Sequence, residues 1–145
     1  VALVASDESQ LEVAMTHLVR IALDNVAGGY VGVVPAAAQG KAMRTIPMIG
    51  TEEVERRLRS DKGGWTLLDV RDADERAQGS IEGSQHVYVG ELNARYRDLD
   101  PSQHYTLMCA SGMRATVAAG WLASRGFENL DVYLGSMGAW KTAHG

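Results

Sequence analysis

The stretch Leu107-Met108-Cys109-Ala110-Ser111-Gly112-Met113-Arg114-Ala115 carries the only cysteine of this chain. Residues 105–108 before it form an apolar run that predicts a buried strand. Residues 112–125 after it predict a helix that Gly126 ends, and Gly112 permits a tight curl because it has no Cβ. We therefore expect Cys109 in a strand-to-helix loop, which is where ligands bind in open parallel α/β sheets.

Three features of this loop favour the thiolate of Cys109 over the thiol, whose ordinary pKa is about 8.5. Backbone N–H groups of the loop can form an anion-binding nest around the sulfur. The following helix directs its positive end toward the same place, and the guanidinium of Arg114 can fold back over the rim. On this segment alone, an incidental cysteine beside a surface arginine fits equally well.

Apolar runs alternate with amphipathic stretches along the rest of the chain. The pattern predicts strands at 1–5, 66–70, 87–89, 105–108 and 130–134, a further short strand within 25–32, and helices at 8–23, 72–78, 91–98, 112–125 and after Thr51. Residues 33–44 lack periodicity and predict a linker. Strands that alternate with helices predict a mostly parallel sheet with helices on both faces.

The composition is that of a globular protein, since 46% of the 145 residues are hydrophobic and 22% are charged. A net charge of −4 argues against a nucleic-acid partner. No apolar run is long enough to cross a membrane. A single cysteine forms no internal disulfide, which fits a reducing compartment, and we expect a cytoplasmic protein.

The sequence predicts no metal site. Its four histidines show no ligand spacing. An acidic cluster at Asp69, Asp72, Asp74 and Glu75 is better explained by a strand end followed by a helix N-terminus. Arg71, within this cluster, can either face the pocket of the site or pair with a neighbouring carboxylate, and we favour the pair.

Two further segments resemble the rhodanese family of sulfurtransferases. Residues 67–84, LLDVRDADERAQGSIEGS, resemble its strand-and-turn signature, a D-V-R strand end followed by a Glu and then G-H-I-P-G-A. Residues 135–140, GSMGAW, resemble the glycine-to-tryptophan motif that closes the same fold. With the Cys109 loop, all three segments follow the order and spacing of the family across 45–145.

The resemblance implies a complete rhodanese domain over 41–145 with Cys109 as its nucleophile. It implies that Cys109 takes a sulfane sulfur from a donor such as thiosulfate or a persulfide, holds it as a persulfide, and passes it to a thiol or to cyanide. No metal or organic cofactor is needed. The expected substrate-binding residues are those of the loop, namely Ala110, Ser111, Gly112, Met113 and Arg114.

The chain departs from the family pattern at three positions. Ser80 and Glu82 stand where the family often has His and Pro, in turn positions with little expected effect on chemistry. Two-domain rhodaneses that use thiosulfate tend to carry an extra arginine where this chain has Glu75. Thiosulfate is therefore in doubt as the natural donor.

The first forty residues contain a weak internal repeat. A shift of 104 positions aligns Leu3, Val13 and Leu18 with identical residues near Cys109, and it sets Ala5 and Gln10 opposite Cys109 and Arg114. We therefore expect 1–40 to be a fragment of a degenerate rhodanese-like domain, a half βαβ unit without nucleophile or cation. The arrangement resembles tandem sulfurtransferases, and also the tail of a metallo-β-lactamase-like persulfide dioxygenase fused to rhodanese domains. Either resemblance leads us to expect a fused or upstream domain before Val1.

Two other functions compete with sulfur transfer. Phosphatases that share this fold resemble C-x5-R, and need a wider cradle for a tetrahedral phosphate. Cys109 and Arg114 form the shorter C-x4-R, which suits a single sulfur atom. Other rhodanese folds are non-catalytic binding or regulatory modules. These commonly lose the cysteine, whereas this chain keeps it.

Overall fold

The computed structural model describes residues 2–20, 28–32, 44–60 and 63–145. The chain forms two compact units, Val1–Thr45 and Ile46–Gly145, and each is described here by itself. The expected linker at 33–44 lies outside the described residues except for Arg44. Within the described ranges, no helix combines the length and the apolar character that crossing a membrane requires.

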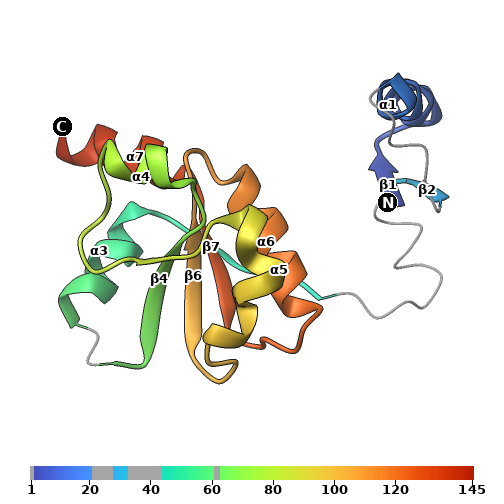
Figure 1. Cartoon of the computed structure of the whole chain (residues 1–145). Coiled ribbons are helices and arrows are strands. Elements are labelled where there is room, and N and C mark those ends of the chain that lie inside the picture. Colours follow the sequence, from blue (N-terminus) through green and yellow to red (C-terminus); the bar gives the residue numbers. More distant parts are fainter. Residues whose placement is uncertain (1, 21–27, 33–43, 61–62) are drawn as a thin grey trace. The chain divides into compact units, whose positions relative to one another are not determined.

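The larger unit is built on a sheet of five strands that all run parallel (Figure 1). The strands lie in the order β3 (Met48–Ile49), β7 (Leu130–Tyr133), β6 (His104–Met108), β4 (Trp65–Asp69) and β5 (Gln85–His86). Leu107 in the central strand pairs with Leu68 on one side and with Val132 on the other. The predicted α/β fold with a parallel sheet is thus confirmed.

Helices cover both faces of this sheet because both faces are apolar. Successive strand residues point to opposite faces, so Leu107 packs in one hydrophobic cluster and Met108 in the other. The Leu107 face is covered by α5 (Leu92–Arg95) and α6 (Met113–Ala123). The Met108 face is covered by α3 (Thr51–Ser60) and α7 (Ser136–His144). Such continuous apolar runs are typical of parallel strands buried on both sides.

Several expected elements differ from the structure. The strand expected at 87–89 is wrong, because the strand is β5 at Gln85–His86 and Val89 already begins the 3-10 helix η1 (Val89–Glu91). The helix expected at 91–98 is broken into η1, α5 and η2 (Tyr96–Asp98). The sequence did not predict β3, whose two residues are too few to show a period, or α7, whose first turn contains Gly138, a poor helix former.

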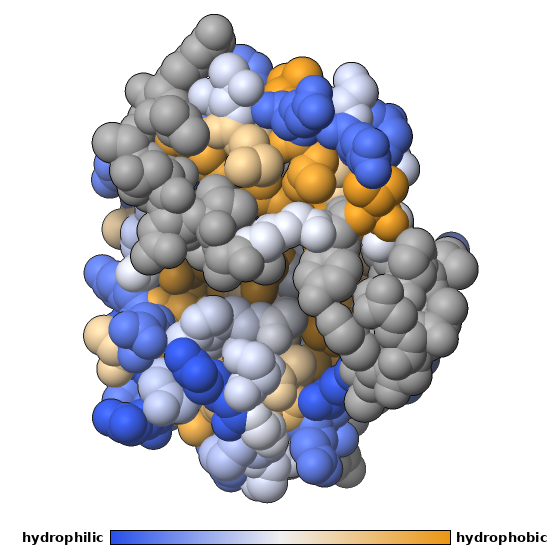
Figure 2. Space-filling model, turned by 90° about the vertical axis from the view of Figure 1, so that its right-hand side faces the viewer, coloured by the Kyte–Doolittle hydropathy of each residue, from blue (hydrophilic) through white to orange (hydrophobic). Residues whose placement is uncertain are grey.

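The smaller unit contains one βαβ arrangement, as expected. The parallel strands β1 (Ala2–Ala5) and β2 (Gly28–Val31) are connected through α1 (Glu8–Arg20). The Asp7 carboxylate caps α1 by accepting the N–H of Gln10 at 2.8 Å. Large apolar side chains of this unit are exposed, among them Val4 (63%). Figure 2 shows one face of the molecule, on which hydrophobic residues lie beside hydrophilic ones. The origin of the smaller unit as a fragment of a degenerate rhodanese-like domain stays a prediction.

Candidate active site

The site lies at the carboxyl edge of the sheet, where three strands end close together. Asp69 ends β4, Cys109 follows β6, and Gly135 follows β7. This edge also carries α4 (Ala73–Ala77) and the start of α7, both at the top of Figure 1. The sequence therefore placed Cys109 correctly, directly after a strand and before a helix.

The Cys109 loop curls around its own sulfur. The N–H of Gly112 donates to Sγ of Cys109 at 3.1 Å. Gly112 has a φ of 103°, a left-handed conformation that glycine adopts without a Cβ penalty. A Cβ built there would be 3.6 Å from its closest neighbour, an ordinary contact. The glycine is therefore required by the backbone conformation and not by crowding.

The surroundings of Cys109 lower the pKa of its thiol. Burial is the largest single effect and raises this pKa, since Cys109 is only 1% exposed. Hydrogen bonds from four backbone N–H groups act in the opposite direction and together prevail; they are those of Ala115 and Arg114 in the first turn of α6 and of Ser111 and Gly112 in the loop. The net result is a cysteine that ionises more readily than a free thiol, as the nest argument predicts.

Arg114 is engaged mainly by Glu75 and only secondarily by the sulfur. Its Nη1 and Nη2 donate to the two carboxylate oxygens of Glu75, at 2.5 and 2.7 Å. This pair lowers the pKa of Glu75 to about 2 and raises that of Arg114, with a smaller contribution from Cys109. The sequence predicted that Arg114 reaches over the loop, but it did not predict that a carboxylate balances its charge there.

Ser136 anchors the loop from the far side, and the sequence analysis missed it. Its hydroxyl accepts the N–H of Cys109 at 3.1 Å and donates to the carbonyl of Tyr133 at 2.8 Å. Ser136 is fully buried and has a φ of 50°, unusual for a residue other than glycine. Its position inside the GSMGAW motif was the available signal.

Arg71 both forms an ion pair and lines the site. Its Nη2 donates to Oδ2 of the fully buried Asp69 at 2.7 Å, so the favoured pair is present. Its guanidinium also donates to the carbonyls of Glu75 and Gly79. Asp72 caps α4 by accepting the N–H of Glu75 at 2.8 Å. These carboxylates thus have protein partners, and the described residues contain no cluster of three or more potential metal-binding side chains.

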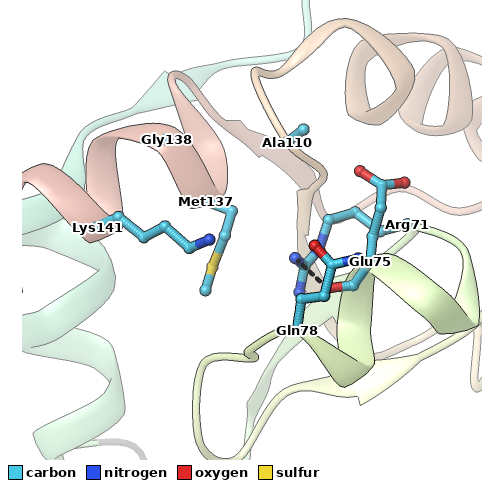
Figure 3. Close-up of a pocket in the computed structure, with 7 residues that line it drawn as sticks. All are labelled: Arg71, Glu75, Gln78, Ala110, Met137, Gly138 and Lys141. Atoms are coloured by element: carbon cyan, nitrogen blue, oxygen red, sulfur yellow. Dashed lines mark hydrogen bonds between the residues drawn. The ribbon is translucent and has the colours of Figure 1, made fainter.

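A cavity of about 220 Å³ adjoins the Cys109 loop (Figure 3). Its lining comes from α7, from the α4 region and from the loop: Arg71, Glu75, Gln78, Ala110, Met137, Gly138 and Lys141. Gln78, Met137 and Lys141 were not predicted, because no motif marks them individually. Of the predicted loop residues, Ala110 lines this cavity, whereas Ser111 is exposed and Met113 is 76% exposed.

A family model described as Rhodanese-like domain matches residues 51–143. The chain is similar to YtwF of Bacillus subtilis, a protein named as a sulfurtransferase, with 31% identity over 96 residues that make up 66% of this chain and 91% of YtwF. It is also similar to the tRNA sulfurtransferase of Vibrio cholerae, with 32% identity over 85 residues. That match covers 56% of this chain but only 18% of the Vibrio protein.

Solved structures are also similar to this chain over about two thirds of its length. A rhodanese-related protein of Thermoplasma volcanium superposes with a TM-score of 0.60 at 26% identity. The superposition covers 67% of this chain and 92% of the Thermoplasma protein. The family model, over residues 51–143, includes the Cys109 loop and both accompanying motifs.

Proposed function

The chain belongs to the rhodanese-like domain family, and on that premise we propose that it is a sulfurtransferase in which Cys109 carries the transferred sulfur as a persulfide. The observation that carries this proposal is the ring of N–H groups around Sγ of Cys109. Such a ring stabilises a thiolate, and it also stabilises the persulfide anion that replaces it. A cysteine that only packs in the core requires neither a stabilised thiolate nor a stabilised persulfide anion.

The reaction has two halves. In the first, the Cys109 thiolate attacks the outer sulfur of thiosulfate or of a persulfide. A bond forms between the two sulfur atoms, and the old S–S bond breaks with its electron pair on the departing sulfite or thiolate. In the second, a thiolate or cyanide attacks the outer sulfur of the Cys109 persulfide, and the Cys109 thiolate is released. The thiolate that leaves is the anion that the loop stabilises.

The test is to incubate the chain with thiosulfate or with glutathione persulfide and to measure its mass. We expect the gain of one sulfur atom, removable by cyanide, and we expect none in the Cys109→Ser variant. A chain that gains no sulfur from any donor contradicts the proposal. If the chain takes up no sulfur but hydrolyses an aryl phosphate, the result supports the alternative function, a phosphatase of the same fold.

A further inference from the structure

The cavity beside Ala110 is lined by two cationic groups, Arg71 and Lys141, whose charges are not equally balanced. The guanidinium of Arg114 is bound through two hydrogen bonds to Glu75, and Arg71 is bound to the buried Asp69. Arg71 shares Asp69 with Arg76, and Arg114, which lies outside the lining, is paired with Glu75; both arginines thus have a carboxylate partner. Lys141 lines the same cavity, and among the described residues no carboxylate lies within ion-pair distance of its ammonium group. Lys141 is therefore the cation that remains available to an anionic ligand.

The side chains that face Lys141 suit a small organic molecule. In Figure 3, Lys141 and Met137 extend from α7 into the cavity, and Arg71 and Gln78 lie on the opposite side. Met137 is only 7% exposed, and it offers a polarisable apolar surface to methylene groups. The amide of Gln78 can donate a second hydrogen bond to a carboxylate. The loop residue Ala110 connects this cavity to the adjacent Cys109.

We propose that Lys141 binds the carboxylate of a small organic thiol, so that the site prefers carboxylate-bearing thiols as acceptors and the matching persulfides as donors. This inference rests on the sulfurtransferase function proposed above. A carboxylate and an ammonium group form a charge-assisted hydrogen bond, stronger than one between neutral groups. Thiosulfate gains less binding free energy from Arg114, because Glu75 already compensates the charge of that arginine.

The transfer step balances without any further reactant. The acceptor thiolate attacks the outer sulfur of the Cys109 persulfide and forms a new S–S bond. The bond between the two sulfur atoms of the persulfide breaks, and its electron pair stays on Cys109, which leaves as the thiolate. The outer sulfur moves with the negative charge that it already carries, so the acceptor leaves as its own persulfide anion and the charges balance. By microscopic reversibility, the same contact with Lys141 serves a persulfide donor in the reverse direction.

The experiment uses the full chain, loaded with sulfur from glutathione persulfide or from thiosulfate and then freed of excess donor. The loss of the persulfide is timed with 3-mercaptopropionate, which carries a carboxylate, and with uncharged 2-mercaptoethanol. For Lys141→Gln we expect about a tenfold slower loss to 3-mercaptopropionate, corresponding to roughly 1.4 kcal/mol, and an unchanged rate with 2-mercaptoethanol. Comparison of the variant with the wild type for each thiol cancels the difference in intrinsic thiol reactivity.

Two further variants separate a contact from a general charge effect. Lys141→Arg keeps the cation, so it should retain most of the preference for 3-mercaptopropionate. Arg59→Gln removes a positive charge from α3, where the side chain of Arg59 is 70% exposed, and it should leave the preference intact. A similar loss of preference in Arg59→Gln would overturn the inference.

The failure of this inference differs from the failure of the proposed function. If the wild type forms no persulfide with any donor, the sulfurtransferase function is wrong and the role of Lys141 is wrong with it. If the persulfide forms and is transferred, but Lys141→Gln slows both thiols equally or neither, the function stands. In that case Lys141 does not select the substrate.

Discussion

The sulfur of Cys109 is subject to two opposing effects on its pKa. Burial raises the pKa, and the surrounding backbone N–H groups lower it by more. Burial depends on side chains that mutation can replace, whereas the backbone N–H groups do not depend on side chains. The backbone N–H groups remain in every variant that keeps the loop, and so the activation of Cys109 is a property of the chain path around it.

We therefore predict that iodoacetamide alkylates Cys109 with a pH midpoint below that of a free thiol, which is about 8.5. The sign follows from the lowered pKa, because the thiolate persists to lower pH and the alkylation rate falls only below the shifted midpoint. The measurement is the alkylation rate against pH. A midpoint at the value of a free thiol contradicts the role of the loop. Arg114→Ala, which keeps the N–H groups, should give a midpoint close to that of the wild type.

At the scale of elements, the first turn of α7 holds the Cys109 loop in place. The N–H groups of Met137 and Gly138 donate to the carbonyls of Cys109 and Ala110 at 3.0 and 2.9 Å. Ser136 completes this contact by accepting the N–H of Cys109. A helix that the sequence did not predict thus fixes the position of the nucleophile and also lines the cavity next to it.

We predict that Ser136→Ala lowers the free energy of unfolding by about 1–3 kcal/mol, because it leaves the buried N–H of Cys109 without a partner. Urea unfolding measures this change. Ser124→Ala is the matched control, since the exposed hydroxyl of Ser124 also bonds to a backbone carbonyl, that of Trp121. Equal effects of the two substitutions would show that the anchor contributes nothing specific.

At the scale of the whole molecule, the site and both hydrophobic clusters belong to one unit. Every residue of the two clusters lies within Ile46–Gly145, as does every residue that lines the cavity beside Ala110. The smaller unit, Val1–Thr45, contains two short strands and one helix in its described part. The physical basis for folding and for the chemistry is therefore concentrated in the larger unit.

We predict that a chain shortened to 46–145 folds cooperatively and keeps the alkylation profile of Cys109, because it retains both hydrophobic clusters and the loop. Urea unfolding followed by circular dichroism, together with the alkylation rate, tests this expectation. Loss of a cooperative transition would show that residues 1–45 contribute to the stability of the larger unit.

The sequence alone determined the features that depend on neighbouring residues. The apolar run before Cys109 and the glycine within its loop predict a strand, a curl and a helix, and the structure contains all three. The alternation of such units predicted the parallel sheet. These features follow from the periodicity of side chains and from backbone conformation, both of which act over a few residues.

Only the tertiary structure decided which distant side chains surround the sulfur. Glu75 and Arg114 are 39 positions apart, and Ser136 is 27 positions from Cys109. They meet because β4, β6 and β7 are neighbours in the sheet and end at the same edge. Local patterns do not encode this strand order, since it results from the packing of all the elements together. The charge balance of the site, with Arg114 compensated and Lys141 available, follows from that packing.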